Sequence, residues 1–412
     1  MTDSDAVFDP TSLRPSLFVD GQWQGAGDGG TRDIVNPADG STVAVVDEAT
    51  PDDALRAVAS ARAAFDDGPW RSVTVGERSD LLNRIADLLQ RDKAELARIE
   101  TLDTGKTFGE SEIDIDDVTS VFRFYADLAV VQADRLIDVD RPEILSRVVH
   151  EPIGVCVMIA PWNYPLLQIS WKIAPALAAG CTMVLKPSEV TPLSTIAFTK
   201  LVEEAGVPAG VVNLLQGSGA VLGDALTRNR DVDFISFTGG LATGRHILAA
   251  AAENVTKVAV ELGGKNPHIV FADAVADDQA FADSVDNVLT GVFLHSGQVC
   301  SAGTRLIIEE SVADRFVAAV AERAETIVIG PGMDPASETG PLVSQAQREK
   351  IEAFVAGGID EGATLVIGGT KPDDAALDGG SYFLPTIFDH CDRSMNIVQE
   401  ETFGPILTVE RF

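Results

Sequence analysis

The amino-acid sequence predicts an α/β protein with a doubly wound, mostly parallel β-sheet, a second α/β domain and a small projecting β arm. Residues 153–272 alternate short apolar runs with stretches of helical period, which is typical of βαβ units covered by helices on both faces. A second series of this kind begins at Pro267. Between the N-terminal helical region and the first series, residues 135–150 alternate like strands around the break at Pro142, which predicts a hairpin.

Within the first series the predicted strands are short and apolar, and the predicted helices are flanked by Gly or Pro. The strands are expected at residues 154–159, 181–185, 211–215, 233–237 and 257–261. The helices between them are expected at residues 166–179, 193–205, 221–226 and 242–252.

Further helices and strands are predicted before and after the first series. Helical patterns before the arm occupy residues 51–66, 76–101 and 111–133. After Pro267, strands are expected at residues 268–271, 304–308, 363–367 and 407–410, and helices at residues 278–294 and 312–326.

Composition limits the function classes. The chain has 31 basic and 63 acidic residues and a net charge of −32, which argues against nucleic acids and anionic membranes as partners. No signal peptide opens it and no run of about 18 apolar residues interrupts it, so a soluble, cytoplasmic protein is expected. The acidic excess suits a high-salt cytoplasm, although an ordinary solvated acidic face is the commoner explanation. Four scattered cysteines and the lack of CxxC or HExxH spacing predict neither a disulfide framework nor a metal site.

Two residues 39 positions apart offer a nucleophile and a base. Cys300 lies in Gly-Gln-Val-Cys, and Glu261 lies in Val-Glu-Leu-Gly-Gly-Lys. A cysteine thiolate attacks electrophilic carbon, and a carboxylate that activates water can release the adduct by hydrolysis. The pair indicates an enzyme, and by itself it also fits a protease or a thioesterase.

Glycines that follow predicted strands are candidates for dinucleotide binding, because backbone N–H groups at a helix start attract phosphate. Gly219 belongs to a GxGxxxG stretch, while Gly239 and Gly240 open the helix after Thr238. Taken alone, these glycines are better explained as simple strand-to-helix turns. Likewise, residues 186–189 fit either ribose binding or an ordinary helix start.

The segment Pro-Trp-Asn-Tyr-Pro ends the first strand of the series, where binding loops gather in such sheets. Its Asn163 could direct an amide donor at a developing oxyanion, and it could also be a plain turn residue between two prolines. Trp162, Tyr164 and Trp171 have packing as their ordinary alternative.

Taken together and in order, six motifs resemble the NAD(P)-dependent aldehyde dehydrogenase superfamily from about residue 15 to the end of the chain. The segment around Cys300 is most similar to the glycine betaine aldehyde dehydrogenases of bacteria and archaea. The motifs are P-W-N-Y-P, K-P-S-E, F-T-G-G-x-x-x-G, V-E-L-G-G-K-N-P, G-Q-V-C-S-A-G-T-R and E-E-T-F-G-P.

The resemblance implies that Cys300 attacks an aldehyde and that Asn163 and the backbone N–H of Cys300 hold the resulting oxyanion. Hydride then passes to nicotinamide, and Glu261 activates the water that hydrolyses the thioester. Lys172 is implied as an electrostatic aid, against the alternative of a lysine that snorkels off its helix.

The resemblance also implies NAD as the cofactor, with NADP possible. Lys186 and Glu189 would hold the adenosine ribose, and the carboxylate of Glu189 would repel a 2′-phosphate. Gly240 stands where many relatives carry Ser, which leaves backbone donors for the pyrophosphate. Glu401 would bind the nicotinamide ribose, with Phe403 near the ring. The full set of expected cofactor residues is Trp162, Lys186, Ser188, Glu189, Gly219, Thr238, Gly239, Gly240, Leu262, Glu401 and Phe403.

For the substrate, Tyr164 and Trp171 are the aromatic candidates for the trimethylammonium group of betaine aldehyde, whose oxidation to glycine betaine would serve osmoprotection. A broad-specificity aliphatic, amino- or semialdehyde dehydrogenase is the alternative, and a catalytically silent binding protein or a pure thioesterase are others. A homo-oligomer, dimer or tetramer, is implied for the full-length chain.

The resemblance divides the chain into an NAD-binding domain (residues 1–130 and 152–266), an oligomerisation arm (131–151) and a catalytic domain (267–412). Relatives continue past Phe412, so a fragment or a truncated gene is expected, with the last part of the family's catalytic domain absent.

Overall fold

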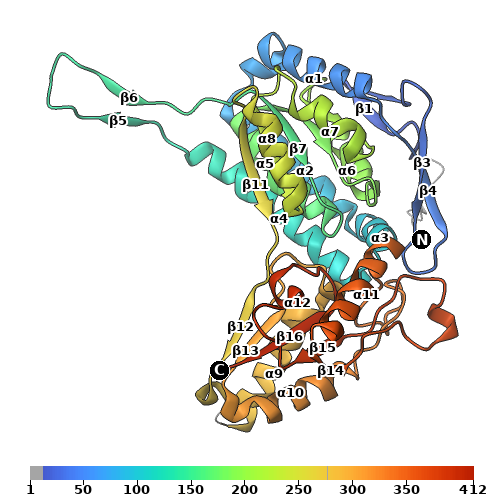
Figure 1. Cartoon of the computed structure of the whole chain (residues 1–412). Helices are drawn as coiled ribbons and strands as arrows, with labels where there is room; N and C mark the ends of the chain where they lie inside the picture. The colour runs from blue at the N-terminus through green and yellow to red at the C-terminus, as the bar shows by residue number, and fades with distance from the viewer. Residues whose placement is uncertain (1–12, 276) are drawn as a thin grey trace. The chain divides into compact units, whose positions relative to one another are not determined.

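The computed structural model describes residues 13–275 and 277–412. Within these residues the chain forms two compact units. Unit 1 comprises the described residues up to Ile34 together with Ala44–Ile99 and Glu112–Glu261, and unit 2 comprises Val35–Val43, Glu100–Ser111 and Leu262–Phe412. Figure 1 shows the helices and strands of both units.

Unit 1 is built on a seven-stranded sheet in the order β11-β10-β7-β8-β9-β1-β2 among the described residues. Strands β7 to β10 pair in parallel, whereas β1 pairs antiparallel with β9 and with β2 at one edge. The strands are β1 (Leu17–Val19), β2 (Gln22–Gln24), β7 (Val155–Ile159), β8 (Thr182–Lys186), β9 (Val212–Leu214), β10 (Phe234–Gly239) and β11 (Lys257–Leu262). The predicted doubly wound sheet is therefore confirmed, with an antiparallel edge that the sequence pattern did not predict.

Helices in two groups cover this sheet. Helix α5 packs on β7 and β8 beside α2 and α6, whereas α1 packs on β7, β8 and β9 beside α7, which contacts α8. They are α1 (Pro51–Asp66), α2 (Val75–Arg91), α5 (Pro165–Ala179), α6 (Leu193–Glu204), α7 (Gly219–Thr227) and α8 (Leu241–Ala252). Strands β7 and β8 are almost wholly buried between these layers, which explains their continuous apolar runs.

The single helix expected at residues 76–101 is wrong. Helix α2 ends at Arg91 with Asp92 as its C-cap, and α3 (Lys93–Thr104) begins immediately after it. The charged residues Arg91, Asp92 and Lys93 read as a continuous helical surface in the sequence, so the break has no Gly or Pro to announce it. Helix α4 (Phe108–Val131) follows, close to the predicted range.

A two-stranded hairpin extends from the body of unit 1 (Figure 1). Its strands β5 (Arg135–Ile137) and β6 (Ser146–Val148) are antiparallel, as the alternating pattern around Pro142 predicted. Leu136 is 70% exposed and Leu145 is 74% exposed, so the hairpin presents apolar side chains to its surroundings.

Unit 2 contains a five-stranded sheet in the order β12-β13-β16-β15-β14. The strands are parallel except β14, which runs antiparallel to β15. They are β12 (Pro267–Val270), β13 (Arg305–Ile308), β14 (Thr364–Ile367), β15 (Thr386–Asp389) and β16 (Ile406–Arg411). The longer helices are α9 (Asp278–Phe293), α10 (Glu310–Ala324) and α11 (Gln345–Asp360), and the short helix α12 (Asn396–Gln399) packs on α11.

Two apolar cores support this sheet. One joins α9 and α10 to β13 and β16 and includes Phe316 and Leu407, and the other lies under α11 and includes Ile351 and Phe388. A short hairpin of β3 (Thr31–Val35) and β4 (Thr42–Asp47) completes the strands of the described chain.

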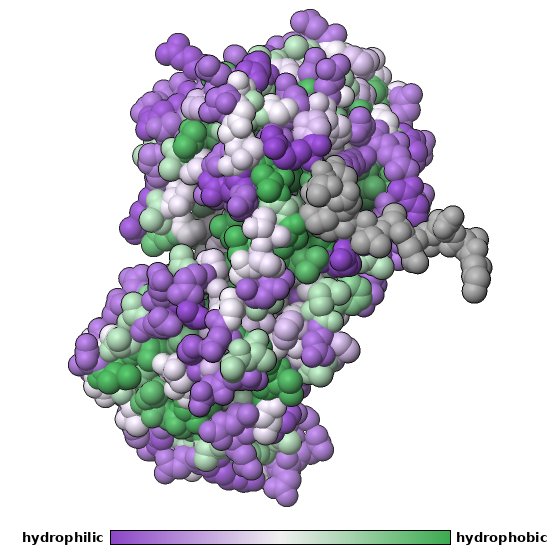
Figure 2. Space-filling model, turned by 90° about the vertical axis from the view of Figure 1, so that its right-hand side faces the viewer, coloured by the Kyte–Doolittle hydropathy of each residue, from purple (hydrophilic) through white to green (hydrophobic). Residues whose placement is uncertain are grey.

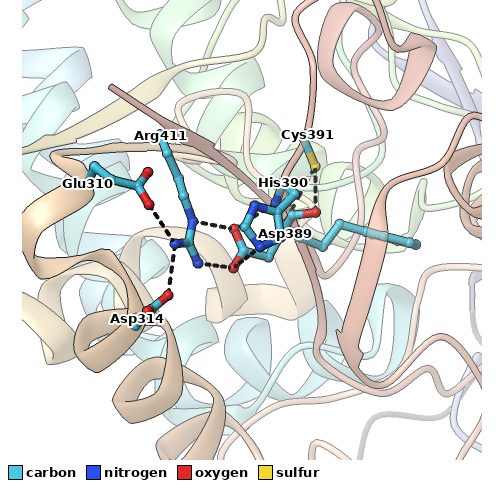
Figure 3. A network of polar contacts seen from close by, with 7 residues as sticks. Glu310, Asp314, Asp389, His390, Cys391 and Arg411 are labelled. Carbon is cyan, nitrogen blue, oxygen red and sulfur yellow. Dashed lines mark hydrogen bonds and ion pairs between the residues drawn. The ribbon is translucent and has the colours of Figure 1, made fainter.

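An ionic network ties the end of β16 to its neighbours in unit 2 (Figure 3). Arg411 is nearly buried and donates to Asp389 of β15 at 3.1 Å and to Asp314 of α10 at 2.8 Å. It also contacts Glu310 at 3.3 Å. Burial alone would raise the pKa of Asp389, but the hydrogen bond and charge of Arg411 outweigh it and lower that pKa.

The visible faces of both units are largely hydrophilic, with scattered apolar residues (Figure 2). This agrees with the composition of the chain, which has 63 acidic and 31 basic residues. Charged side chains of this kind remain in contact with water. None of the helices formed by the described residues combines the length and the apolar character needed to cross a membrane.

Candidate active site

A pocket of about 300 Å³ opens at the carboxyl ends of the central strands of unit 1. It lies where β7, β8 and β10 end. The strand order reverses beside β7, and open α/β sheets bind ligands at such a topological switch point. All eight expected cofactor residues of unit 1 line it: Trp162, Lys186, Ser188, Glu189, Gly219, Thr238, Gly239 and Gly240. The fold thus brings together residues up to 78 positions apart in four separate motifs.

Lys186 and Glu189 form a charged pair in this pocket. The Nζ atom of Lys186, a side chain only 4% exposed, lies 3.4 Å from Glu189 Oε2. Burial is the main cause that lowers the pKa of Lys186, and the charge of Glu189 opposes it. Burial would also raise the pKa of Glu189, but the charge of Lys186 and the N–H groups of Glu189 and Gly219 outweigh it and lower that pKa. Glu189 is therefore a carboxylate at neutral pH.

The glycines of the pocket leave its backbone accessible. An added Cβ atom would meet no atom within 4 Å at Gly219 or Gly240. Gly219 is the first residue of α7, and its N–H donates to Glu189 Oε1 at 3.4 Å. Gly240 is the N-cap residue of α8 and has no side chain to accept a hydrogen bond. The first N–H groups of that helix therefore have no acceptor from an N-cap side chain.

Several pocket residues were missed by sequence reasoning. Their signal was a helical spacing: Thr227 follows Gly219 and Gly223 of the GxGxxxG stretch at intervals of four, and Thr243 and Ile247 follow Gly240 at intervals of three and four. His246 also lines the pocket, and its Nε2 atom lies 2.9 Å from Asp224 Oδ1.

The Pro-Trp-Asn-Tyr-Pro segment forms the turn between β7 and α5. Asn163 is only 2% exposed, which shows that its amide faces the interior and not bulk water. Tyr164 is the N-cap residue of α5, and Pro165 occupies the first position of the helix, where a missing N–H costs nothing. Trp171, further along α5, is 49% exposed.

Lys172 projects from α5 into a buried polar group. Its Nζ atom donates to Thr238 Oγ1 at 2.7 Å and to Ser236 Oγ at 3.3 Å, both on β10. Burial lowers the pKa of Lys172 to about 8, and the charge of Glu261 opposes that shift. Lys172 and Glu261 therefore interact within unit 1. Because Lys172 is buried and hydrogen-bonded, the alternative of an ammonium that snorkels into solvent does not describe it.

Glu261 lies at the end of β11 and its side chain is exposed. It is the last residue of unit 1, whereas Cys300 belongs to unit 2. Cys300 follows a short 3₁₀ segment, Leu294–Gly297, and is partly exposed. Cys156, Cys181 and Cys391 are buried, so Cys300 is the most accessible of the four thiols.

The remaining expected cofactor residues belong to unit 2. Glu401 Oε1 accepts a hydrogen bond from Gly264 N at 3.2 Å, just beyond Leu262. Burial raises the pKa of Glu401, against the Gly264 N–H and the charges of Lys350 and Lys265. Phe403 has a positive φ of 58°, and its carbonyl accepts from Gln347 Nε2 at 2.7 Å.

A metal site has no visible basis in the described part of the chain. No group of three or more His, Cys, Asp or Glu side chains there could hold a metal ion.

Comparison with known proteins gives these residues a context. Residues 23–412 match the model of the aldehyde dehydrogenase family. The chain is 52% identical over 400 residues to a betaine aldehyde dehydrogenase of Bacillus subtilis, covering 97% of this chain and 81% of that protein. It is 41% identical over 401 residues to aminoaldehyde dehydrogenase 2 of Solanum lycopersicum, covering 96% of this chain and 78% of that protein.

The fold is shared with solved structures. The structure of this chain matches the crystal structure of a Staphylococcus aureus betaine aldehyde dehydrogenase in complex with NAD⁺ with a TM-score of 0.94. The two are 47% identical, and the match covers 97% of this chain and 78% of that one. Since the family model covers nearly the whole chain and the fold agrees, this protein is an enzyme of the aldehyde dehydrogenase family.

Proposed function

We propose that this enzyme oxidises betaine aldehyde to glycine betaine with NAD as the oxidant. The observation that carries the cofactor part is the pocket of unit 1, where a buried lysine, a carboxylate and an uncapped helix start converge. The substrate part is supported by similarity to two bacterial proteins named betaine aldehyde dehydrogenases, at 52% and 47% identity.

The residues of the pocket fit the adenosine half of a dinucleotide. Its volume of about 300 Å³ is at the lower end of ligand pockets and suits part of the cofactor. Lys186 can donate to ribose hydroxyls and Glu189 can accept from them, while the start of α8 at Gly240 offers N–H groups to phosphate. Glu189 carries a negative charge, so we propose that it disfavours the 2′-phosphate of NADP.

The two units would then have separate roles, with unit 1 as the NAD-binding part and unit 2 as the catalytic part. In unit 2, we assign Glu401 to a ribose hydroxyl of the cofactor, Phe403 to packing beside its ring, and Leu262 to the cofactor as well. The hydrogen bond from Gly264 N orients one carboxylate oxygen of Glu401 and leaves the other for a ligand. The bound cofactor supplies a hydride acceptor.

Cys300 is the proposed nucleophile because it is the most accessible thiol of the chain. Its thiolate attacks the aldehyde carbon and forms a C–S bond, while the carbonyl π electrons move to oxygen. We assign the side-chain amide of Asn163 and the backbone N–H of Cys300 to that oxyanion. When the oxyanion reforms the carbonyl, the carbon loses a hydride and a thioester of Cys300 remains.

Glu261 is the proposed base for the second half of the reaction. It takes a proton from water, the hydroxide adds to the thioester carbonyl, and the C–S bond breaks to release the carboxylic acid and the Cys300 thiolate. Lys172 would support Glu261 electrostatically, because the charges of the two groups act on each other inside unit 1.

We assign Tyr164 and Trp171 to the trimethylammonium group of the substrate. Aromatic faces bind quaternary ammonium groups through cation–π attraction, and a tryptophan that is 49% exposed on α5 can offer such a face. The acidic net charge of the chain would also favour a cationic aldehyde.

An assay of three aldehydes tests the substrate. We expect kcat/KM to be higher for betaine aldehyde than for 4-aminobutanal or propanal, with NAD as the oxidant. A higher kcat/KM for 4-aminobutanal would assign the enzyme to the aminoaldehydes, and for propanal to the plain aliphatic aldehydes. Trp171→Ala should raise KM for betaine aldehyde while the KM for propanal stays nearly constant.

The hairpin of β5 and β6 is the proposed oligomerisation arm of a dimer or tetramer. Its side chains Leu136 and Leu145 are more than two-thirds exposed in this chain, a state in which apolar residues are normally covered. Sedimentation analysis of a Leu136→Asp, Leu145→Asp double variant should show a smaller particle than the wild type.

A further inference from the structure

The backbone in front of Cys300 adopts an unusual conformation. His295 (φ 47°, ψ 40°) and Ser296 (φ 52°, ψ 34°) are both left-handed, and Gly297 follows with a φ of 71°. Side chains other than glycine rarely adopt this region, and such a conformation persists only where the surroundings hold it. The contacts that hold this turn therefore determine the position of Cys300.

One of these contacts comes from a residue 185 positions earlier in the sequence. Glu110 Oε1 accepts a hydrogen bond from His295 N at 3.0 Å. Its other oxygen, Oε2, accepts from the backbone N–H and the hydroxyl of Thr107, each at 2.8 Å. Glu110 thus caps the start of α4 with one carboxylate oxygen and accepts a hydrogen bond from the left-handed turn with the other.

The next residues of the turn are held within unit 2 by neighbouring loops. Ser296 N donates to Thr339 Oγ1 at 3.1 Å. Gln298 is fully buried, and its Oε1 atom accepts from Val343 N at 2.8 Å. These bonds fix the turn relative to residues 339–343, and Glu110 fixes it relative to α4.

A second contact holds the chain on the other side of the nucleophile. Asn266 Nδ2 donates to the carbonyl oxygen of Cys300 itself at 2.9 Å and lies 3.5 Å from that of Ala302. The carbonyl of Asn266 in turn accepts from Arg305 N at 3.2 Å, where β13 begins beside β12. The amide therefore anchors the Cys300 loop to the edge of the sheet.

We propose that Glu110 and Asn266 are positioning residues that clamp the Cys300 loop from both sides. The clamp holds the Cys300 thiol and its backbone N–H in one place, so that the attack on the aldehyde starts from a fixed geometry. This inference depends on the proposed role of Cys300 as the nucleophile. Neither residue touches substrate or cofactor in the proposed reaction.

The chain offers a matched control for Glu110. Glu77 caps α2 through Thr74 in the same way, with Oε2 bonded to the N–H and hydroxyl of Thr74, and it has no bond to the Cys300 turn. Aspartate can fill this capping role, as Asp53 does with Thr50 in α1. Glu110→Asp should therefore keep the cap of α4 while it withdraws the carboxylate from His295, and Glu77→Asp makes the same change without touching the turn.

Asn266 has a similar control in unit 1. Asn213 Nδ2 donates to the carbonyl oxygens of Met183 at 3.1 Å and Gly210 at 2.8 Å, far from Cys300 in the sequence. Replacing either amide with aspartate puts a carboxylate oxygen against two carbonyl oxygens without changing the size of the side chain. Asn213→Asp thus reports the general cost of such a clash, and Asn266→Asp reports that cost together with the effect on Cys300.

The experiment compares the four variants with the wild type and with Cys300→Ala. Three quantities are measured on the folded protein: kcat and the KM for NAD with betaine aldehyde, the rate of alkylation of Cys300 by iodoacetamide from pH 6 to 9, and the Tm. We expect Glu110→Asp and Asn266→Asp to lower kcat about 10- to 100-fold and to shift the alkylation profile, with the KM for NAD changed by less than about twofold. Glu77→Asp and Asn213→Asp should leave both readouts at the wild-type level whatever their Tm.

The proposal is overturned if Glu110→Asp keeps kcat and the alkylation profile within about twofold of the wild type, or if each variant loses activity only in proportion to its Tm, controls included. Should Asn266→Asp fail to fold, Glu110→Asp decides alone. A Cys300→Ala variant that still oxidises aldehydes would instead refute the proposed function, a result that differs from either outcome for the clamp.

Discussion

Lys172 Nζ donates a 2.7 Å hydrogen bond to Thr238 Oγ1, and the charge of Glu261 acts on the same ammonium. Thr238 lines the pocket at the end of β10. One buried lysine therefore connects the proposed deacylation base to the proposed cofactor pocket, entirely within unit 1.

This lysine makes the stability of the protein depend on pH. Its pKa is lowered from 10.5 to about 8 by burial. Between pH 8 and 10.5 the unfolded chain binds more protons at this site than the folded chain, so stability increases as pH rises; below pH 8 the full cost of the buried ammonium remains. Relative to Lys172→Met, the wild type should gain about 3 kcal/mol across that range.

Urea unfolding of the wild type and Lys172→Met at pH 8 and pH 10 measures this difference. Lys257→Met is the control, since Lys257 is exposed and lies at the start of β11. If the difference in unfolding free energy between wild type and Lys172→Met is the same at both pH values, Lys172 is not a buried ammonium that loses its proton near pH 8.

The roles of Cys300 and Glu261 separate in transient kinetics. Cys300→Ala should abolish both aldehyde oxidation and hydrolysis of activated esters, because both need the thiolate. Glu261→Gln should release about one equivalent of NADH per site in a burst and then stall, because the thioester forms and water is not activated. Stopped-flow absorbance at 340 nm records the burst. If Glu261→Gln still binds NAD but gives no burst, Glu261 acts before deacylation.

Glu189 should set the preference between the two dinucleotides. Removing its charge in Glu189→Gln relieves the repulsion of a 2′-phosphate, so the ratio of kcat/KM for NAD over NADP should fall about tenfold. Glu48→Gln is the matched control, because Glu48 also accepts from a backbone N–H at the start of α7, that of Ser218 at 3.2 Å, but does not line the pocket. Equal ratios in Glu189→Gln and the wild type would remove Glu189 from cofactor selection.

Two glycines should respond in opposite ways to an added side chain. Gly240→Ser adds a hydroxyl at an N-cap where a Cβ meets nothing within 4 Å, so stability should rise by a few tenths of a kcal/mol with little change in the KM for NAD. At Gly263 a Cβ would lie 1.8 Å from Glu401 Oε1. Gly263→Ala should therefore displace Glu401 and raise the KM for NAD about tenfold, the cost of one charged hydrogen bond.

Thermal unfolding and steady-state kinetics of the two variants check both expectations. A Gly263→Ala enzyme with the wild-type KM for NAD would show that Glu401 does not bind the cofactor. A Gly240→Ser enzyme that loses NAD would show that the phosphates need the space at Gly240.

Strands β7 and β8, which end at the pocket, could be predicted because they are buried on both faces. The apolar runs that became β7 and β8 are continuous and end in Gly, Pro or polar residues, and such a pattern has few other interpretations. Helix α11 carried no comparable signal, since Gly357 and Gly358 lie within it and its buried residues are few. Strand β15 was missed as well.

The residues of the candidate site also fall into those that the sequence could predict and those that it could not. The place of Lys186 and Glu189 at the pocket agrees with their position after a predicted strand, whereas their proposed roles came from the family resemblance. The clamp of Glu110 and Asn266 could not, since Glu110 reads as an ordinary capping residue and meets His295 only through the tertiary fold. Contacts between segments 185 residues apart have no periodic signature in a single sequence.

The most direct test of the whole account is the mass of the covalent intermediate. Glu261→Gln is mixed with betaine aldehyde and NAD, quenched in acid during the stall, digested, and examined by mass spectrometry. We expect a trimethylglycyl thioester on the peptide that contains Cys300, and no such adduct when NAD is omitted. An adduct on another cysteine, or an unmodified Cys300 peptide after a full NADH burst, would contradict it.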